Sequence, residues 1–169
     1  MKLIGAFFCV AACLLFGLAF LENEKRKMQA YNGLSNALML IKTELCASLP
    51  PLAELMKQAA ESSVGCVKAF FQIVLDEFYK IGETEFAEIW NEAAEESFDL
   101  FTQEQLKMLF LPGMLLGKSA GETQAEALEA AALYFRAELN KKEEKMSGSR
   151  KLAIGLPVCA GLLIVILLC

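Results

Sequence analysis

The clearest pattern along the chain is a pair of uninterrupted apolar runs, one near each end. The first extends from Leu3 to Leu21 and the second from Leu152 to Cys169, and neither contains a charged side chain. As an α-helix, each run spans about 28 Å, close to the ~30 Å hydrocarbon core of a bilayer. The pattern therefore predicts transmembrane helices over residues 3–21 and 152–169, with a separate domain over residues 22–151.

The first run also has features of a cleaved secretion signal. Lys2 precedes it, and the segment from Val10 to Cys13 resembles a lipoprotein cleavage box. However, the run exceeds the roughly 7–15 apolar residues of a signal peptide. It also stays apolar from Leu14 to Leu21, where a lipoprotein would begin a polar tether. We favour a retained membrane helix, and cleavage is the alternative.

Basic residues beside the two runs predict the orientation of the chain. Residues 25–27 are all basic and follow the first run, and the second run is preceded by Lys141, Lys142, Lys145, Arg150 and Lys151. Only Lys2 lies on the other side of the runs. Because cytoplasmic flanks of membrane helices are enriched in Lys and Arg, we expect a two-span protein of the cell membrane whose central domain is cytoplasmic.

Between the runs, apolar residues recur every three or four positions, as on one face of an α-helix. The first such stripe consists of Tyr31, Leu34, Leu38, Ile41 and Leu45. Later stripes predict helices over about 52–61, from 66 to Gly82, over about 83–97, from Thr102 and from Ser119. One set of aromatic residues is interpreted as core: Phe70, Phe71, Phe78, Phe86, Trp90, Phe98 and Phe101. No strand-like alternation is present. The fold class is therefore all-α, a bundle of about six helices with antiparallel neighbours and flanking transmembrane helices.

Three local features mark the ends of the later helices. Thr102 with Gln105, and Ser119 with Glu122, have the spacing of a capping box. Pro112 lies inside the fifth stripe and is expected to kink or interrupt that helix, because proline lacks an N–H donor. The segment 116–119 reads Leu-Gly-Lys-Ser, but a phosphate-binding loop would have glycine in place of Pro112 and would follow a strand. We therefore interpret this segment as a helix end followed by a helix cap.

Composition excludes several classes of function. The chain has 169 residues, is 56% apolar and contains no histidine, which excludes histidine-based catalysis and histidine-ligated metals. Its six cysteines form no Cys-x-x-Cys pair, so they indicate apolar filling in a reducing compartment. We expect no catalytic residue, no cofactor, no metal and no enzymatic activity.

Acidic residues are concentrated between Asp76 and Glu104, where Lys80 is the only basic residue. Five of them have helical spacing on the side away from Trp90: Glu85, Glu88, Glu92, Glu95 and Glu96. They predict either a docking surface for a basic partner or a solvated helix face. Nucleic acid is not an expected partner, because a chain with 21 acidic and 16 basic residues would be repelled by phosphate.

The layout from end to end resembles the stage III sporulation protein AB family of endospore-forming Firmicutes. The resemblance rests on the start of the chain, on segments 38–45 and 49–55, on the helix around Trp90, and on segment 116–119 followed by Gln124. Family members usually have Asp where this chain has Ala120. If that Asp contacts a partner in the family, Ala120 cannot make the same contact. If it supports the helix start, Ser119 and Glu122 can replace it.

The resemblance implies a non-enzymatic membrane platform subunit of the secretion-like complex that links mother cell and forespore. Its cytoplasmic domain would be similar to the F-type platform domain of type II secretion machines, in the mother-cell membrane around the forespore. The implied partners are the other channel subunits, their cytoplasmic ATPase and the lipid bilayer, and association of several copies is compatible with this role. A membrane-anchored signalling or regulatory adaptor with an acidic docking helix is the alternative. The candidate docking residues are Glu85, Glu88, Glu92, Glu95, Glu96, Leu116, Gly117, Ser119 and Gln124.

Overall fold

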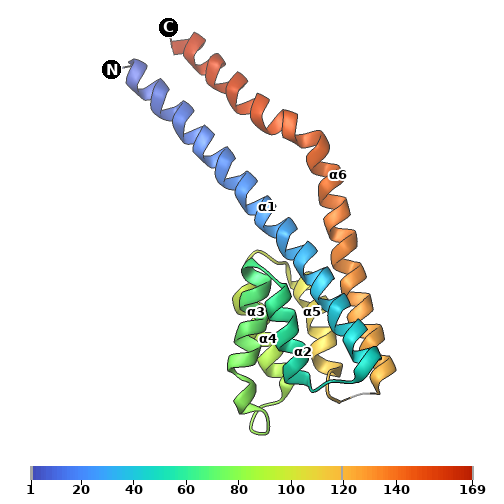
Figure 1. Cartoon of the computed structure of the whole chain (residues 1–169). Coiled ribbons are helices and arrows are strands. Elements are labelled where there is room, and N and C mark those ends of the chain that lie inside the picture. Colours follow the sequence, from blue (N-terminus) through green and yellow to red (C-terminus); the bar gives the residue numbers. More distant parts are fainter. Residues whose placement is uncertain (1, 119, 169) are drawn as a thin grey trace. The chain divides into compact units, whose positions relative to one another are not determined.

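The computed structural model describes the backbone of residues 2–118 and 120–168, and the side chains of residues 19, 21–118 and 120–145. This part of the chain forms six α-helices and one short 3₁₀ helix, and none of it forms a strand (Figure 1). In chain order these are α1 (Lys2–Ser48), α2 (Leu52–Ser62), α3 (Gly65–Asp76), η1 (Phe78–Lys80), α4 (Phe86–Ser97), α5 (Gln103–Leu115) and α6 (Gly121–Leu168). The predicted all-α class with six helices is confirmed.

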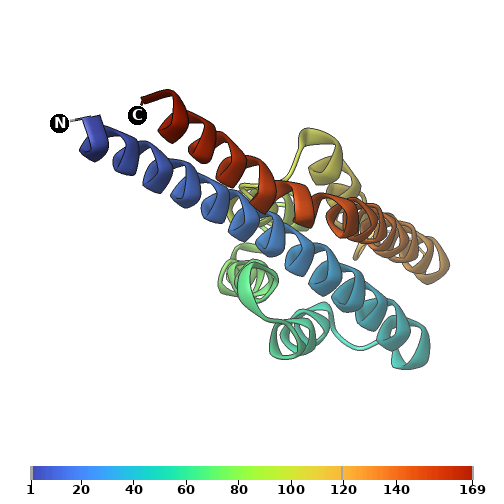
Figure 2. The ribbon, with the colours of Figure 1, turned by 90° about the horizontal axis from the view of Figure 1, so that it is seen from above.

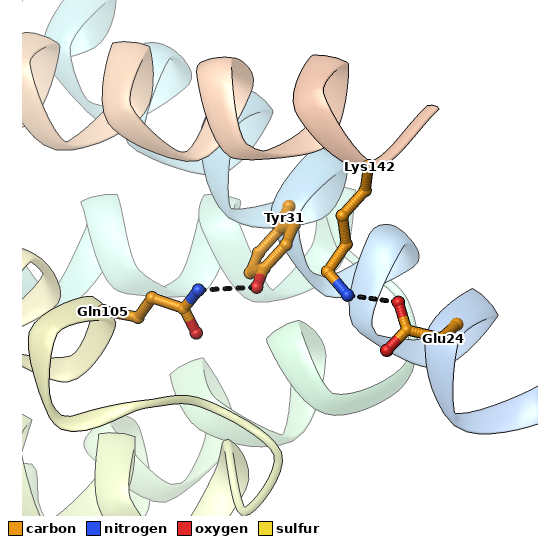
Figure 3. A network of polar contacts seen from close by, with 4 residues as sticks. All are labelled: Glu24, Tyr31, Gln105 and Lys142. Carbon is orange, nitrogen blue, oxygen red and sulfur yellow. Dashed lines mark hydrogen bonds and ion pairs between the residues drawn. The ribbon is translucent and has the colours of Figure 1, made fainter. Parts of the chain in front are cut away.

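Two compact units make up the chain: Met1–Met28 with Asn140–Cys169, and Gln29–Leu139. In the first unit, Lys142 of α6 donates a hydrogen bond to the carboxylate of Glu24 on α1, and both side chains are largely buried (Figure 3). The predicted membrane spans, 3–21 and 152–169, lie outside the residues whose side chains are described, apart from Ala19 and Leu21. Within the described residues, no helix is long and apolar enough to cross a membrane.

In the second unit, α1 and α6 run antiparallel. Lys42 of α1 pairs with Glu129 of α6 at 2.8 Å, whereas Arg136, further along α6, bonds to Asn32, which lies earlier in α1. The stripe predicted for α1 faces inward, and all five of its residues are buried, from Tyr31 to Leu45. Figures 1 and 2 show α2 to α5 gathered beside these parts of α1 and α6. In the order of the sequence, the four short helices therefore lie between the two long helices α1 and α6.

A chain of aromatic rings forms the core of this unit. The ring centroid of Phe70 on α3 lies 4.8 Å from that of Trp90 and 5.5 Å from that of Phe98. Phe98 stacks on Phe101 at 4.8 Å, and the Phe101 ring lies 5.2 Å from the Tyr31 ring of α1. Rings in such tilted and edge-on arrangements attract each other beyond the burial of their area. Phe70 therefore connects the ring of Trp90 to the rings of Phe98, Phe101 and Tyr31, and we call these the two halves of the aromatic core.

The capping box at Thr102 is confirmed. The Thr102 hydroxyl accepts a hydrogen bond from the Gln105 N–H, and the Gln105 side-chain oxygen accepts one from the Thr102 N–H. Figure 3 shows that the amide nitrogen of Gln105 then donates to the hydroxyl of Tyr31 at 2.8 Å. Gln105 therefore caps the start of α5 and also attaches α5 to α1. Both Gln105 and Tyr31 are buried.

Pro112 was expected to kink or interrupt the fifth helix, and an interruption is wrong, because α5 continues through Pro112 to Leu115. Pro112 lacks the N–H that would bond the carbonyl of Met108. The next carbonyl along α5, that of Leu109, accepts a 2.8 Å hydrogen bond from the indole N–H of Trp90. The same indole packs directly against Gly113, where a Cβ would lie 2.3 Å from Trp90 Cδ1. The tryptophan therefore holds α5 across its proline.

Two predicted boundaries between α3 and α4 also need correction. The third helix ends at Asp76 instead of Gly82, and the fourth begins at Phe86 instead of near residue 83. The N–H groups of Glu83 and Thr84 both donate to the carbonyl of Lys80, which closes a tight turn. Gly82 occupies this turn with φ +114°, a conformation that is open to glycine but strained for other residues. Side chains alone do not show where such a turn replaces a helix.

Candidate docking site

Four of the five candidate glutamates lie on one exposed side of α4, and we call Glu88, Glu92, Glu95 and Glu96 the acidic face. Glu85 is exposed too, but it precedes the first residue of the helix. The opposite side of α4 is fully buried and carries Trp90. The predicted separation of a charged side from a core side is therefore present in α4.

Lys80 is the basic residue within this acidic stretch, and it is held by a near neighbour. Its ammonium group pairs with the carboxylate of Glu77. That hydrogen bond raises the pKa of Lys80 above its ordinary value, and the negative charge of Glu92 adds to the shift. Lys80 is therefore already paired with a carboxylate at the end of α3.

A groove of about 490 Å³ opens beside the start of α4, and we call it the terminal groove. Its apolar side chains are Leu52, Phe78, Ile81, Phe86 and Leu116, and its remaining lining residues are Gly82, Glu83, Thr84, Glu85, Gly117 and Lys118. These residues come from the start of α2, the connection between α3 and α4, and the turn between α5 and α6. Figure 1 shows these connections at one end of the Gln29–Leu139 unit.

An ion pair crosses the rim of the terminal groove. Lys118 Nζ lies 2.6 Å from Glu85 Oε2, and both side chains are at least half exposed. Glu85 and Lys118 are 33 residues apart in the sequence, and their pairing joins the residue that precedes α4 to the segment that follows Leu116 and Gly117. Gln124 lies outside the groove lining, on the first turns of α6, and Ser119 lies outside the described residues. The structure thus brings together Glu85, Leu116 and Gly117.

Leu116 and Gly117 form a turn with a strict backbone requirement. Leu116 has φ −60° and ψ 125°, Gly117 has φ +80°, and the N–H of Lys118 donates to the carbonyl of Leu115. This geometry is a type II β-turn, whose third residue needs a positive φ and is usually glycine. The Leu116 side chain is buried and anchors the turn. The segment follows a helix, as expected for a helix end and not for a phosphate-binding loop.

The residue expected to cap α6, Ser119, lies outside the described residues. The helix begins at Gly121, and the carbonyl of Ala120 accepts the hydrogen bond from the N–H of Gln124. Ala120 therefore occupies the N-cap position, although alanine has no side-chain acceptor for the unpaired N–H groups of the first turn. This is the position at which the resemblance in sequence noted an Asp.

We expect Ala120→Asp to raise the free energy of unfolding by about 1 kcal/mol, because its carboxylate can accept from the first-turn N–H groups. Equilibrium urea unfolding of the full chain, followed by Trp90 fluorescence, measures the change. The matched control is Ala130→Asp, an exposed position inside α6, where aspartate should cost about 0.7 kcal/mol. Equal effects of the two variants would contradict a capping role at residue 120.

Among the side chains that the structure describes, no three Cys, Asp or Glu residues are grouped in a way that could hold a metal ion. The sequence prediction missed most of the terminal groove. Phe78 and Phe86 were interpreted as core, which holds for Phe86. Lys118 was considered only within the 116–119 segment, which was interpreted as a helix end and not as part of a groove. Only the pairing of residues 85 and 118 in space reveals the groove.

Comparisons with known proteins identify the class and then the family. The fold is an all-α bundle in which four short helices are inserted between two long ones. It matches a solved structure titled "Stage III sporulation protein AB (SpoIIIAB)" with a TM-score of 0.64 and 18% identity, over 73% of this chain and 98% of that chain. At this identity the match shows a shared fold. The comparison with curated protein sequences gave no match.

The family model for stage III sporulation protein AB matches residues 2–169. The chain therefore belongs to the stage III sporulation protein AB family. The resemblance noted in the sequence is confirmed.

Proposed function

We propose that this chain is a non-enzymatic platform subunit of the secretion-like sporulation complex between mother cell and forespore. Its spans, residues 3–21 and 152–169, would anchor it in the mother-cell membrane around the forespore. The domain between them would lie in the cytoplasm and dock the ATPase of the same complex. Family membership supports the sporulation role, and the topology rests on the basic flanks of the two spans.

The acidic face is the observation that carries the docking proposal. Its four glutamates are exposed on one side of α4, while the other side of the same helix is held by the aromatic core. A rigid helix with concentrated charge steers a partner of opposite charge and fixes its orientation. A basic surface on the ATPase would complement this face.

Reversing the charge of Glu88, Glu92 and Glu95 to lysine tests the proposal. We expect the triple variant to lose at least about ten-fold in capture of the purified companion ATPase, because each reversal replaces an attraction with a repulsion. Pulldown with the full-length chain at low and high salt measures the loss, and the wild-type capture should weaken with salt.

The matched control carries the same charge change on exposed glutamates of other helices: Glu54→Lys, Glu61→Lys and Glu126→Lys. We expect it to retain most of the capture. If both variants capture the ATPase equally while their circular dichroism and unfolding remain those of the wild type, the acidic face is only a solvated surface.

A further inference from the structure

We propose that the terminal groove binds a segment of a partner protein in which apolar residues are flanked by arginine or lysine. In the unbound chain, Lys118 occupies the acidic anchor of this site, Glu85, and the partner's basic residue displaces it. This inference deepens the proposed function, because it names the kind of segment that docks at this end. It rests on the proposed function only for the identity of the partner.

The apolar lining indicates that the groove is covered by another surface. Ile81 is 42% exposed in the connection before α4, and Leu52 and Phe78 are partly exposed. Beneath them, Phe86 and Leu116 are buried and belong to the core, so the floor is fixed in place. An apolar recess with a rigid floor and a few polar groups at its edge is typical of a binding site. A leucine-sized side chain would bury the exposed part of Ile81.

The charges of the groove select a basic segment. Glu83 and Glu85 both belong to the lining, and Lys118 is its basic member. The acidic face then continues along α4 from Glu88. A basic segment would be attracted along this whole line, whereas an acidic peptide or a phosphate backbone would be repelled.

The ion pair between Lys118 and Glu85 is suited to displacement. The two side chains remain 50% and 65% exposed, and exposed pairs of this kind contribute little to stability. An incoming arginine can bind the Glu85 carboxylate through two parallel hydrogen bonds, which an ammonium group cannot do. When the incoming arginine replaces Lys118, the Glu85 carboxylate therefore remains paired. Burial of an apolar side chain of the partner segment in the groove then adds net affinity.

Fluorescence anisotropy with model peptides tests this site on the purified full-length chain in maltoside micelles. The probe is a labelled peptide with leucines between arginines. One control peptide has glutamates in place of the arginines, and another has serines in place of the leucines. We expect only the first peptide to bind, with an affinity that falls as salt rises.

Lys118 competes with the basic residue of the peptide for Glu85, so its removal should strengthen peptide binding. We expect Lys118→Gln to bind the probe about three-fold more tightly, since breaking an exposed ion pair no longer opposes binding. Lys107→Gln removes the same charge from an exposed position of α5 outside the groove and should change the affinity by less than about 1.5-fold. In a Glu85→Gln background, the gain from Lys118→Gln should disappear.

Two further variants test the apolar part of the site. Ile81→Ser should weaken binding about five-fold, because it removes an apolar side chain from the groove. Val64→Ser makes a similar change at an exposed residue between α2 and α3, outside the groove, and should leave the affinity unchanged.

The inference is overturned if the glutamate peptide binds as well as the arginine peptide, or if no peptide binds. It is also overturned if Lys118→Gln gains no more than Lys107→Gln, or if Ile81→Ser binds like the wild type. Peptide binding at the groove without capture of the ATPase would reject the proposed function and retain this inference. Capture of the ATPase without peptide binding would reject this inference and retain the proposed function.

Discussion

Gly113→Ala is expected to lower the free energy of unfolding by at least about 2 kcal/mol, although alanine is the better helix former by roughly 1 kcal/mol. The new Cβ would lie 2.3 Å from Cδ1, 2.5 Å from Cγ and 3.0 Å from Cβ of Trp90. These atoms are at the root of a buried side chain, so the whole indole must move. That movement would also break the hydrogen bond from the indole N–H of Trp90 to the Leu109 carbonyl. This bond lies next to the position where Pro112 lacks an N–H donor.

Urea unfolding measures this loss directly, because Trp90 is the chain's single tryptophan and lies in the core. The control is Gly121→Ala at the start of α6, where the nearest atom to a new Cβ is Leu49 Cδ2 at 3.8 Å. It should leave stability unchanged within about 0.5 kcal/mol. In a Trp90→Leu background, followed by circular dichroism, the cost of Gly113→Ala should shrink. Equal effects at the two glycines would contradict the packing described for α5.

Phe70→Ala should cost about 4 kcal/mol, in the range measured for buried phenylalanine in other proteins. Phe70 is fully buried, and its ring contacts those of Phe71, Trp90 and Phe98. Its removal would leave a cavity where the two halves of the aromatic core meet. The shift in urea midpoint, monitored by circular dichroism, measures the effect.

Tyr79→Ala is the matched control for Phe70→Ala, because it removes an aromatic ring that is 78% exposed. We expect a change within about 0.5 kcal/mol. If the two substitutions cost the same, the ring contacts of Phe70 do not hold the core together.

Local patterns in the sequence predicted the elements whose causes are local. The α1 stripe from Tyr31 to Leu45 repeats at helical spacing, and burial of that face confirms it. Thr102 and Gln105 satisfy each other within one turn, so the start of α5 is visible from three-residue spacing. The family resemblance also depended on linear segments and is confirmed.

Features that depend on contacts between distant residues were not visible in the same way. Pro112 is a helix breaker by its own chemistry, and the contact that holds α5 beside it comes from the indole of Trp90, which bonds the carbonyl of Leu109, 19 residues later in the chain. Glu85 and Lys118 were assigned to separate features because no local pattern relates them. The groove between them exists only once three chain connections meet at one end of the bundle.

Heat-resistant spore counts from a strain that lacks this gene test the central claim, that the chain docks a partner within a sporulation complex. We predict normal vegetative growth, arrest after engulfment and loss of nearly all heat-resistant spores. Wild-type protein should restore the count, and the triple variant of Glu88, Glu92 and Glu95 should not, although it folds and accumulates normally. Full sporulation without the gene, or rescue by the triple variant to the wild-type count, would contradict the account.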